Sequence, residues 1–185
     1  MSAGVRIVSP IDGSIVAERP YAGDAEVERA LAAAQAAQRE WATVPIAERG
    51  RYCLAMLEAM LAMQGDLTIE LARMMGRPIR YGGEMGGFAE RVRHMVAIAE
   101  EGLAPIEVEH SAAFRRRIVR EPVGTVLVVA PWNYPYMTAI NTIAPALIAG
   151  NAVVLKHASQ TILVGEHLAE ALDLPKATVH RIAQQ

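Results

Sequence analysis

Two stretches decide the fold: residues 122–135, PVGTVLVVAPWNYP, and residues 145–157, PALIAGNAVVLKH. Each contains an apolar run, TVLVVA at 125–130 and AVVL at 152–155. Such runs are typical of strands that are covered on both faces in a parallel sheet. The residues between them have a helical pattern, which Pro145 is expected to bend and Gly150 to end in a left-handed conformation. Strand, helix and strand predict a right-handed βαβ unit.

The N-terminal part predicts a hairpin followed by four amphipathic helices. Asp12 and Gly13 form a dipeptide that favours hairpin turns. Asp24 is placed to cap the first helix, and apolar residues then recur at helical spacing. The other helices are expected after Pro45, over 66–75 and over 88–103. Each has an apolar stripe that must be buried, so together they predict a helical layer.

Residues 106–120 alternate polar with apolar or bulky side chains and predict a β-ribbon with charged faces. The fold class that follows is α/β, with a helical layer beside a partial Rossmann-like parallel sheet. Three parts are expected: 1–104 for the hairpin and helices, 105–121 for the ribbon, and 122–185 for the βαβ unit.

Composition excludes several classes of protein. The 185 residues are 52% hydrophobic with a net charge of -2, which fits one ordinary domain or two small ones and predicts neither a nucleic-acid nor a membrane surface. The single cysteine cannot form an internal disulfide, and the N-terminus lacks the pattern of a secretion signal, so the cytoplasm is the expected location. The five histidines show no paired metal-ligand spacing, and no metal site is predicted.

Parallel strands deliver their carboxyl ends to one edge of a sheet, where ligands bind. The first strand delivers Asn133 to this edge, and the second delivers Lys156 and His157. The NH2 group of Asn133 can stabilise a developing oxyanion, and Lys156 can donate to ribose or phosphate oxygens. The alternatives are a turn-forming asparagine and a solvated lysine. His157 is either a cofactor contact or a surface-loop residue.

The stretches EPVGTVLVVAPWNYP (121–135) and APALIAGNAVVLKHASQT (144–161) together resemble the aldehyde dehydrogenase superfamily. SPIDGSIVAERP (9–20) and ERGRYCLAMLEAML (48–61) add to this resemblance. It implies an incomplete aldehyde dehydrogenase fold, oxidation of a small aldehyde to a carboxylic acid with NAD or NADP, and a homo-oligomer, dimer or tetramer, built through the ribbon.

The resemblance also implies roles for single residues. Asn133 matches the asparagine that stabilises the thiohemiacetal oxyanion, and Lys156 matches the lysine that contacts the adenosine ribose. Tyr136 and Met137 are expected near the substrate. The positions matched to the cofactor groove are Val129, Ala130, Pro131 and Trp132, with His157, Ala158 and Ser159 following the lysine. Many members have Pro-Ser-Glu after this lysine, and Ser159 in place of the carboxylate indicates tolerance of NADP.

Two departures limit these expectations. The sequence stops before the family's nucleophile, and Cys53 lies on an apolar helical stripe as a core thiol, so the 185-residue chain alone is expected to be inactive. A non-catalytic truncated fragment or interaction module is therefore the main alternative. GGEMGG at 82–87 is interpreted as a helix connection because it lacks the spacing of a phosphate loop. A remote alternative is DNA binding through a helix-turn-helix in 168–185, with its turn at 173–175.

Overall fold

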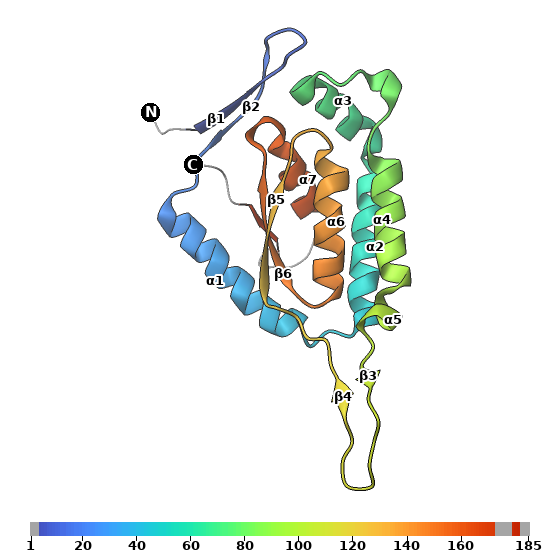
Figure 1. The fold of residues 1–185 in the computed structure, drawn as a ribbon. Coiled ribbons are helices and arrows are strands. Elements are labelled where there is room, and N and C mark those ends of the chain that lie inside the picture. Colours follow the sequence, from blue (N-terminus) through green and yellow to red (C-terminus); the bar gives the residue numbers. More distant parts are fainter. Residues whose placement is uncertain (1–3, 173–178, 182–185) are drawn as a thin grey trace.

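A parallel sheet in the order β5-β6-β7 lies at the centre of the molecule (Figure 1). The computed structural model describes residues 4–172 and the backbone of 179–181. The strands are β5 (Thr125–Ala130), β6 (Ala152–His157) and β7 (Val179–Arg181), and α6 (Pro135–Ile148) connects the first two. The predicted α/β class, with helices and a partial parallel sheet, is confirmed.

The C-terminal strand corrects the DNA-binding alternative. That alternative needs a second helix through residues 179–181, but Val179–Arg181 is a strand that pairs in parallel with β6. The turn predicted at 173–175 lies outside the described residues. A second correction concerns β6, which continues past Leu155 to His157, so that Lys156 and His157 are strand residues.

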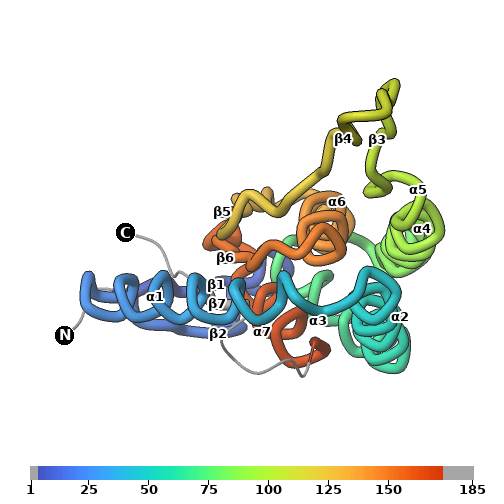
Figure 2. Tube along the Cα trace, turned by 90° about the horizontal axis from the view of Figure 1, so that it is seen from below, coloured from blue at the N-terminus to red at the C-terminus, as the bar shows by residue number. Residues whose placement is uncertain are grey.

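Helices cover both faces of the sheet. One face carries α1 (Asp24–Trp41), whose Ala34 packs with Ala152 and Val154 of β6. The other face carries α6 and α7 (Leu163–Leu172), where Val153 and Leu155 join the main core. This arrangement follows from the alternation of side chains along a strand. Figures 1 and 2 show α1 on one side of the sheet and α6 on the other.

The remaining helices form the expected layer beyond α6. Helix α4 packs against α6, and α2 packs against both α4 and α7 (Figure 2). Large apolar side chains, among them Phe88 and Met56, are completely buried there. The bounds are α2 (Ile46–Ala62), α3 (Gln64–Met75), η1 (Ile79–Tyr81), α4 (Met85–Ala97) and α5 (Ala99–Leu103).

Three helix boundaries differ from the prediction. Gly23 is the N-cap of α1, and Asp24 lies in the first turn, where its charge still favours the helix N-terminus. Helix α3 begins two residues before Asp66, at Gln64. The helix expected over 88–103 begins at Met85 and is divided at Ile98 into α4 and α5. The end of α3 is as predicted, because Gly76 has a φ of 74° in the left-handed region.

The N-terminal hairpin and the ribbon are both present. Strands β1 (Gly4–Val8) and β2 (Ile15–Pro20) pair in antiparallel fashion around a turn in which Asp12 Oδ1 accepts a hydrogen bond from the Ser14 backbone N–H at 3.0 Å. In the ribbon, β3 (Ile106–Glu107) pairs with β4 (Arg117–Ile118). It projects away from the body of the molecule with both strands exposed (Figure 1).

The connection from α6 to β6 ties the two halves of the βαβ unit together. Gly150 has a φ of 90°, as predicted for the residue after a helix end. Asn151 is buried; its Nδ2 donates to the Ala146 carbonyl at 3.1 Å, and its Oδ1 accepts from the Gly124 N–H at 3.0 Å. These bonds hold the start of β5 against the end of α6. They thereby help to set the register that brings the two strand ends together.

Across residues 4–172 and 179–181, the structure contains no helix with the length and apolar character needed to cross a membrane.

Candidate active site

The carboxyl ends of β5 and β6 lie side by side, as the sequence predicts. Ala130 pairs with His157, and the Ala158 N–H donates to the Ala130 carbonyl at 3.1 Å. The segments that follow, the turn at 131–134 and η2 (Ser159–Thr161), therefore begin at neighbouring points of one sheet edge. The candidate residues from both strands are brought together at this edge.

The candidate residues of the two strands lie on opposite faces of the sheet. Val129 pairs with Lys156, and both lie on the face that carries α1, because they alternate with residues of the main core. This face is open along β5, where Leu127 is 60% and Val129 is 63% exposed. An apolar strip with a lysine beside it is thus accessible on the sheet.

Ala130 and His157 lie on the opposite, buried face and are 3% and 2% exposed. The surface-loop interpretation of His157 is therefore wrong. Its ring packs so closely against α7 that a Cβ added to Gly165 would lie 3.1 Å from the imidazole Cδ2. Burial, with a contribution from Lys156, lowers the pKa of His157 to about 4, so the imidazole is neutral at pH 7.

Asn133 lies in the exposed turn between β5 and α6. Its Oδ1 accepts a hydrogen bond from the Tyr134 backbone N–H at 3.1 Å. That bond occupies the amide oxygen and leaves the NH2 group available as a donor, which is the group that an oxyanion site needs. Trp132 and Tyr134 flank it, each 49% exposed.

Two charged residues that the sequence did not single out hold this turn. Arg77 Nη1 lies 2.8 Å from Glu84 Oε1, and Arg77 Nη2 donates to the Asn133 carbonyl. Glu84 Oε2 accepts from the Met137 backbone N–H at 2.9 Å. The Arg77 guanidinium also lies over the Tyr134 ring, 4.6 Å from its centroid. The signals in sequence were weak: Glu84 lies in the glycine-rich connection, and Arg77 follows a helix-ending glycine.

Glu84 is almost completely enclosed, with a side chain that is 2% exposed. Burial raises the pKa of its carboxyl group, while the bonds from Met137 and Arg77 oppose this rise. A buried carboxylate is tolerated only where it is paired and hydrogen-bonded. Both Glu84 oxygens meet this condition, one through Arg77 and one through Met137.

The other expected site residues lie around the edge. Pro131 leads from β5 into the turn and is half-buried. Ala158 and Ser159 follow β6 and are also partly accessible. Tyr136, expected near the substrate, is instead completely buried, and this expectation is corrected. Met137 packs toward α4, since a Cβ on Gly87 would lie 2.7 Å from its sulfur.

Cys53 is a core residue, as predicted. It is 0% exposed on α2, and burial raises the pKa of its thiol to about 12. A thiol in such surroundings is protonated at neutral pH and is not a nucleophile. Among the described residues, no group of three or more histidine, cysteine, aspartate or glutamate side chains is arranged to hold a metal ion.

The fold and the sheet edge define an α/β protein with a partial parallel sheet and an amide donor just after the carboxyl end of its first parallel strand. The model of the aldehyde dehydrogenase family matches residues 2–183, and this chain belongs to that family.

Among curated relatives, betaine aldehyde dehydrogenase 2 of Rhizobium meliloti (strain 1021) is 34% identical over 168 residues, which are 89% of this chain and 34% of that protein. Benzaldehyde dehydrogenase (NAD(+)) of Pseudomonas putida is 32% identical over 163 residues, covering 86% of this chain and 33% of that protein. The chain thus spans about a third of the length of these two relatives.

Solved structures agree with the family assignment. PnpE in complex with nicotinamide adenine dinucleotide matches with a TM-score of 0.86 and 30% identity, over 97% of this chain and 38% of that one. An NAD-dependent benzaldehyde dehydrogenase from Corynebacterium glutamicum matches with a TM-score of 0.88 and 27% identity, over 99% of this chain and 41% of that one. An NADP-dependent enzyme from E. coli shares the fold, with a TM-score of 0.91 and 24% identity over 99% of this chain and 39% of that one.

Proposed function

We propose that this chain supplies the oxyanion amide and part of the cofactor groove of an NAD(P)-dependent aldehyde dehydrogenase, which oxidises an aldehyde to a carboxylic acid. The observation that carries the proposal is the juxtaposition at the carboxyl edge of the sheet. The Asn133 amide follows β5 with its NH2 group available as a donor, and the neighbouring strand carries Lys156. An amide donor serves the developing oxyanion, and an ammonium group serves ribose hydroxyls or phosphate oxygens.

The cofactor is proposed to lie along the open face of β5. Val129 offers an apolar surface there and Lys156 a charge, while Pro131 and Trp132 continue the surface into the turn. Ala158 and Ser159 are partly accessible at the next strand end. Ala130 and His157 lie beneath and support this surface from the core side. A serine at position 159 can donate to a 2'-phosphate, which supports use of NADP as well as NAD.

When bound, the family's cofactor would accept a hydride from the former aldehyde carbon. Within this chain, the expected contribution is to bind, orient and stabilise. The 185 residues alone are proposed to be inactive, because their single cysteine is Cys53 and its thiol is buried. A non-catalytic fragment or interaction module is the second candidate. It is favoured by the burial of the Cys53 thiol. It is also favoured because the chain spans only 34% of the length of the betaine aldehyde dehydrogenase relative.

Association is proposed to complete the protein, as a homo-oligomer built through the exposed β3–β4 ribbon. Ile106 and Ile118 pair across this ribbon and are 46% and 57% exposed. Exposed apolar side chains on a projecting ribbon are suited to packing against another subunit. The proposal also includes a division of the chain into 1–104, 105–121 and 122–185. It further includes a cytoplasmic location and no nucleic-acid or membrane partner.

Titration of the isotope-labelled chain with NAD and NADP, followed by backbone NMR, tests the cofactor groove. We expect weak binding, with shifts concentrated at Val129, Trp132 and Lys156. Lys156→Ala should weaken the shifts, whereas Arg91→Ala should not, since Arg91 lies on α4, in the helical layer that packs against α6 on the other side of the sheet. Shifts confined to other surfaces, or none at any soluble cofactor concentration, would contradict the proposal.

Two further measurements separate the proposed enzyme from the fragment. Incubation of the chain with betaine aldehyde or benzaldehyde and NAD should give no reduced cofactor, whereas turnover would disprove the inactivity proposal. The intact mass of the protein isolated from its native cells shows whether further residues accompany these 185. A native mass equal to that of the chain, with no cofactor shifts, would favour the non-catalytic candidate.

A further inference from the structure

The start of α6 lacks a cap of its own. Tyr134 is its N-cap residue and makes no side-chain capping bond. The first backbone N–H groups of a helix have no partner within the helix, so another group must satisfy them. At Met137 that group is the Glu84 carboxylate, which reaches across from the start of α4, 53 residues away in the sequence. A negative charge is well placed there, because the N-terminal end of a helix is electropositive.

Arg77 extends the same contact to the turn. Its guanidinium pairs with Glu84, donates to the Asn133 carbonyl and covers the Tyr134 ring. The planar guanidinium presents several donors in fixed directions, so one side chain can hold all three groups. Arg77 and Glu84 therefore hold the chain at Asn133 itself and at two positions that follow it, the Tyr134 ring and the Met137 backbone N–H.

Asn133 itself has little else to fix it. It lies in an exposed turn, and its side chain bonds to the N–H of the next residue. That local bond orients the amide relative to its own turn but does not fix the turn relative to the sheet and helices. An amide that stabilises charge must already be in place before the charge develops, because reorientation during the reaction costs part of the stabilisation.

We propose that Arg77 and Glu84 are positioning residues, which join the helical layer to the 131–137 segment and hold the Asn133 amide at the end of β5. The catalytic meaning of that placement rests on the proposed function. The placement itself does not, and the test below measures it directly in the 185-residue chain.

The test uses four variants and one matched control. Arg77→Ala removes all three Arg77 contacts, and Arg77→Lys keeps the charge but loses the planar fork. Glu84→Ala removes both acceptors, and Glu84→Gln keeps one oxygen for the Met137 N–H. Arg80→Ala is the control: Arg80 also lies over a tyrosine, 5.0 Å from the Tyr81 ring, but has no bond to the turn. Urea denaturation of each variant identifies any that no longer fold.

Amide hydrogen exchange at Tyr134 and Met137 is the first readout. Loss of a hydrogen bond to a charged group allows about ten- to a hundredfold faster exchange. We expect this at Met137 in Glu84→Ala, with partial rescue in Glu84→Gln. Arg77→Ala removes neither amide's own bond, so it should accelerate exchange at Tyr134 and Met137 by a smaller factor through loosening of the turn, with partial rescue in Arg77→Lys. The β6 amides should change only with the measured global stability, and Arg80→Ala should match the wild type.

The Asn133 side-chain NH2 resonance is the second readout, assigned by its loss in Asn133→Ala. Its 15N relaxation should report faster motion in Arg77→Ala and Glu84→Ala, which a loss of global stability alone does not produce in folded protein. Unchanged exchange and relaxation, or equal acceleration across the sheet, would overturn the positioning role. A chain that binds no cofactor but shows the expected local loosening would refute the proposed function and leave the positioning role intact.

Discussion

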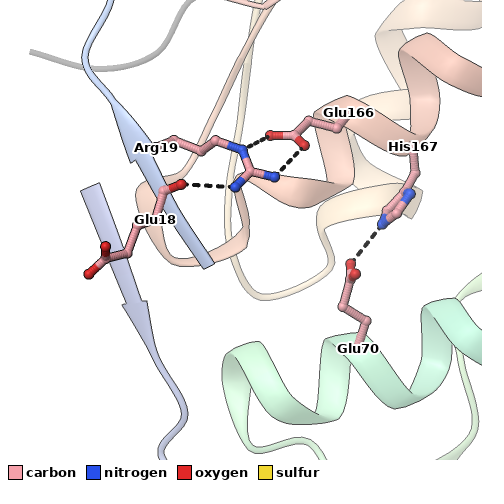
Figure 3. Close-up of polar contacts among 5 residues, drawn as sticks. All are labelled: Glu18, Arg19, Glu70, Glu166 and His167. Atoms are coloured by element: carbon pink, nitrogen blue, oxygen red, sulfur yellow. Dashed lines mark hydrogen bonds and ion pairs between the residues drawn. The ribbon is translucent and has the colours of Figure 1, made fainter. Parts of the chain in front are cut away.

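Two arginine–glutamate contacts join N-terminal segments to the βαβ part of the molecule, and they differ in what they hold. The Arg77–Glu84 pair lies beneath the Asn133 turn, and its glutamate side chain is 2% exposed. The Arg19–Glu166 pair joins the hairpin to α7 through two bonds of 2.9 Å, with side chains 34% and 27% exposed (Figure 3). The first pair binds backbone groups of the turn and α6, whereas the second is a bridge between side chains.

The surroundings of the second pair make it part of a polar contact region. Arg19 also donates to the Glu18 carbonyl at 2.8 Å, and His167 Nε2 lies 2.8 Å from Glu70 Oε1 of α3 (Figure 3). This region joins the hairpin, α3 and α7 at a partly hydrated surface. Water can replace some of its bonds when one is lost. At Glu84, water cannot do so without entering the core, and this difference predicts unequal costs of substitution.

The largest expected effect is that of Glu84→Ala. It leaves the Met137 N–H and the Arg77 charge without their shared partner in a nearly closed site, which should cost about 3 kcal/mol of the free energy of unfolding. Urea denaturation measures this, with the exposed Glu90→Ala on the same helix as the control. A loss no larger than that of the control would contradict the distinction between the two contacts.

The next effect is a dependence of stability on pH at His157, on the buried side of the same sheet edge. Its folded pKa of about 4 lies below the ordinary histidine pKa of 6.5, so between these pH values the unfolded chain binds the proton more strongly. Stability should therefore rise with pH across this window, by on the order of 2–3 kcal/mol from this group. Denaturation of His157→Gln at several pH values should lack this rise, and the exposed His94→Gln should keep it.

The polar contact region provides a pH dependence of opposite sign at His167, where the hydrogen bond that the ring donates to Glu70 raises the pKa of the imidazole. Its stabilising contribution is complete below the unfolded value and is lost as the pH rises through the folded value. A fall in stability at higher pH that disappears in His167→Gln would confirm the contrast with His157. We expect a smaller change there than at His157, because the pair is partly hydrated. The same denaturation series measures it, and a change of equal sign at both histidines would refute the comparison.

Arg19→Ala should cost about 1 kcal/mol, since Arg19 is partly exposed and its ion pair is screened by water. Denaturation at low and high salt provides the sharper test. The difference in free energy of unfolding between Arg19→Ala and the wild type should shrink as the salt concentration rises. The corresponding difference for Glu84→Ala should change little. Equal salt dependence of the two differences would mean that burial does not separate the two contacts.

The smallest expected effect on stability is that of Asn133→Ala, at about 0.5 kcal/mol or less, because the side chain is exposed and bonds only to the adjacent N–H among the described residues. A small cost at Asn133 beside a large cost at Glu84 would show that the protein stabilises the position of the amide without depending on the amide for folding. Thermal denaturation of the two variants in one buffer makes the comparison. A cost at Asn133 as large as that at Glu84 would indicate a structural role for the amide.

Much of the fold was accessible from local patterns. The apolar runs of β5 and β6 predicted buried parallel strands, and the glycines at 76 and 150 predicted two helix ends. Predictions failed where several segments decide the outcome. The sequence predicted that Lys156 and His157 follow the strand, yet pairing with β5 extends β6 through both residues. The DNA-binding alternative failed at 179–181, because pairing with β6 favours a strand there.

The sequence by itself determined that two parallel strands would bring Asn133 and Lys156 to one edge, because the carboxyl ends of parallel strands always share an edge. The motifs that flank them also indicated the family. Only the tertiary structure decided that Lys156 lies on the open face and His157 on the closed one, since the covering helices determine which face of a strand is buried. It also brought Glu84 and Arg77 to the turn. No local pattern encodes that contact, because its members come from two separate segments, 77–84 and 133–137, that meet only when the helical layer packs against α6.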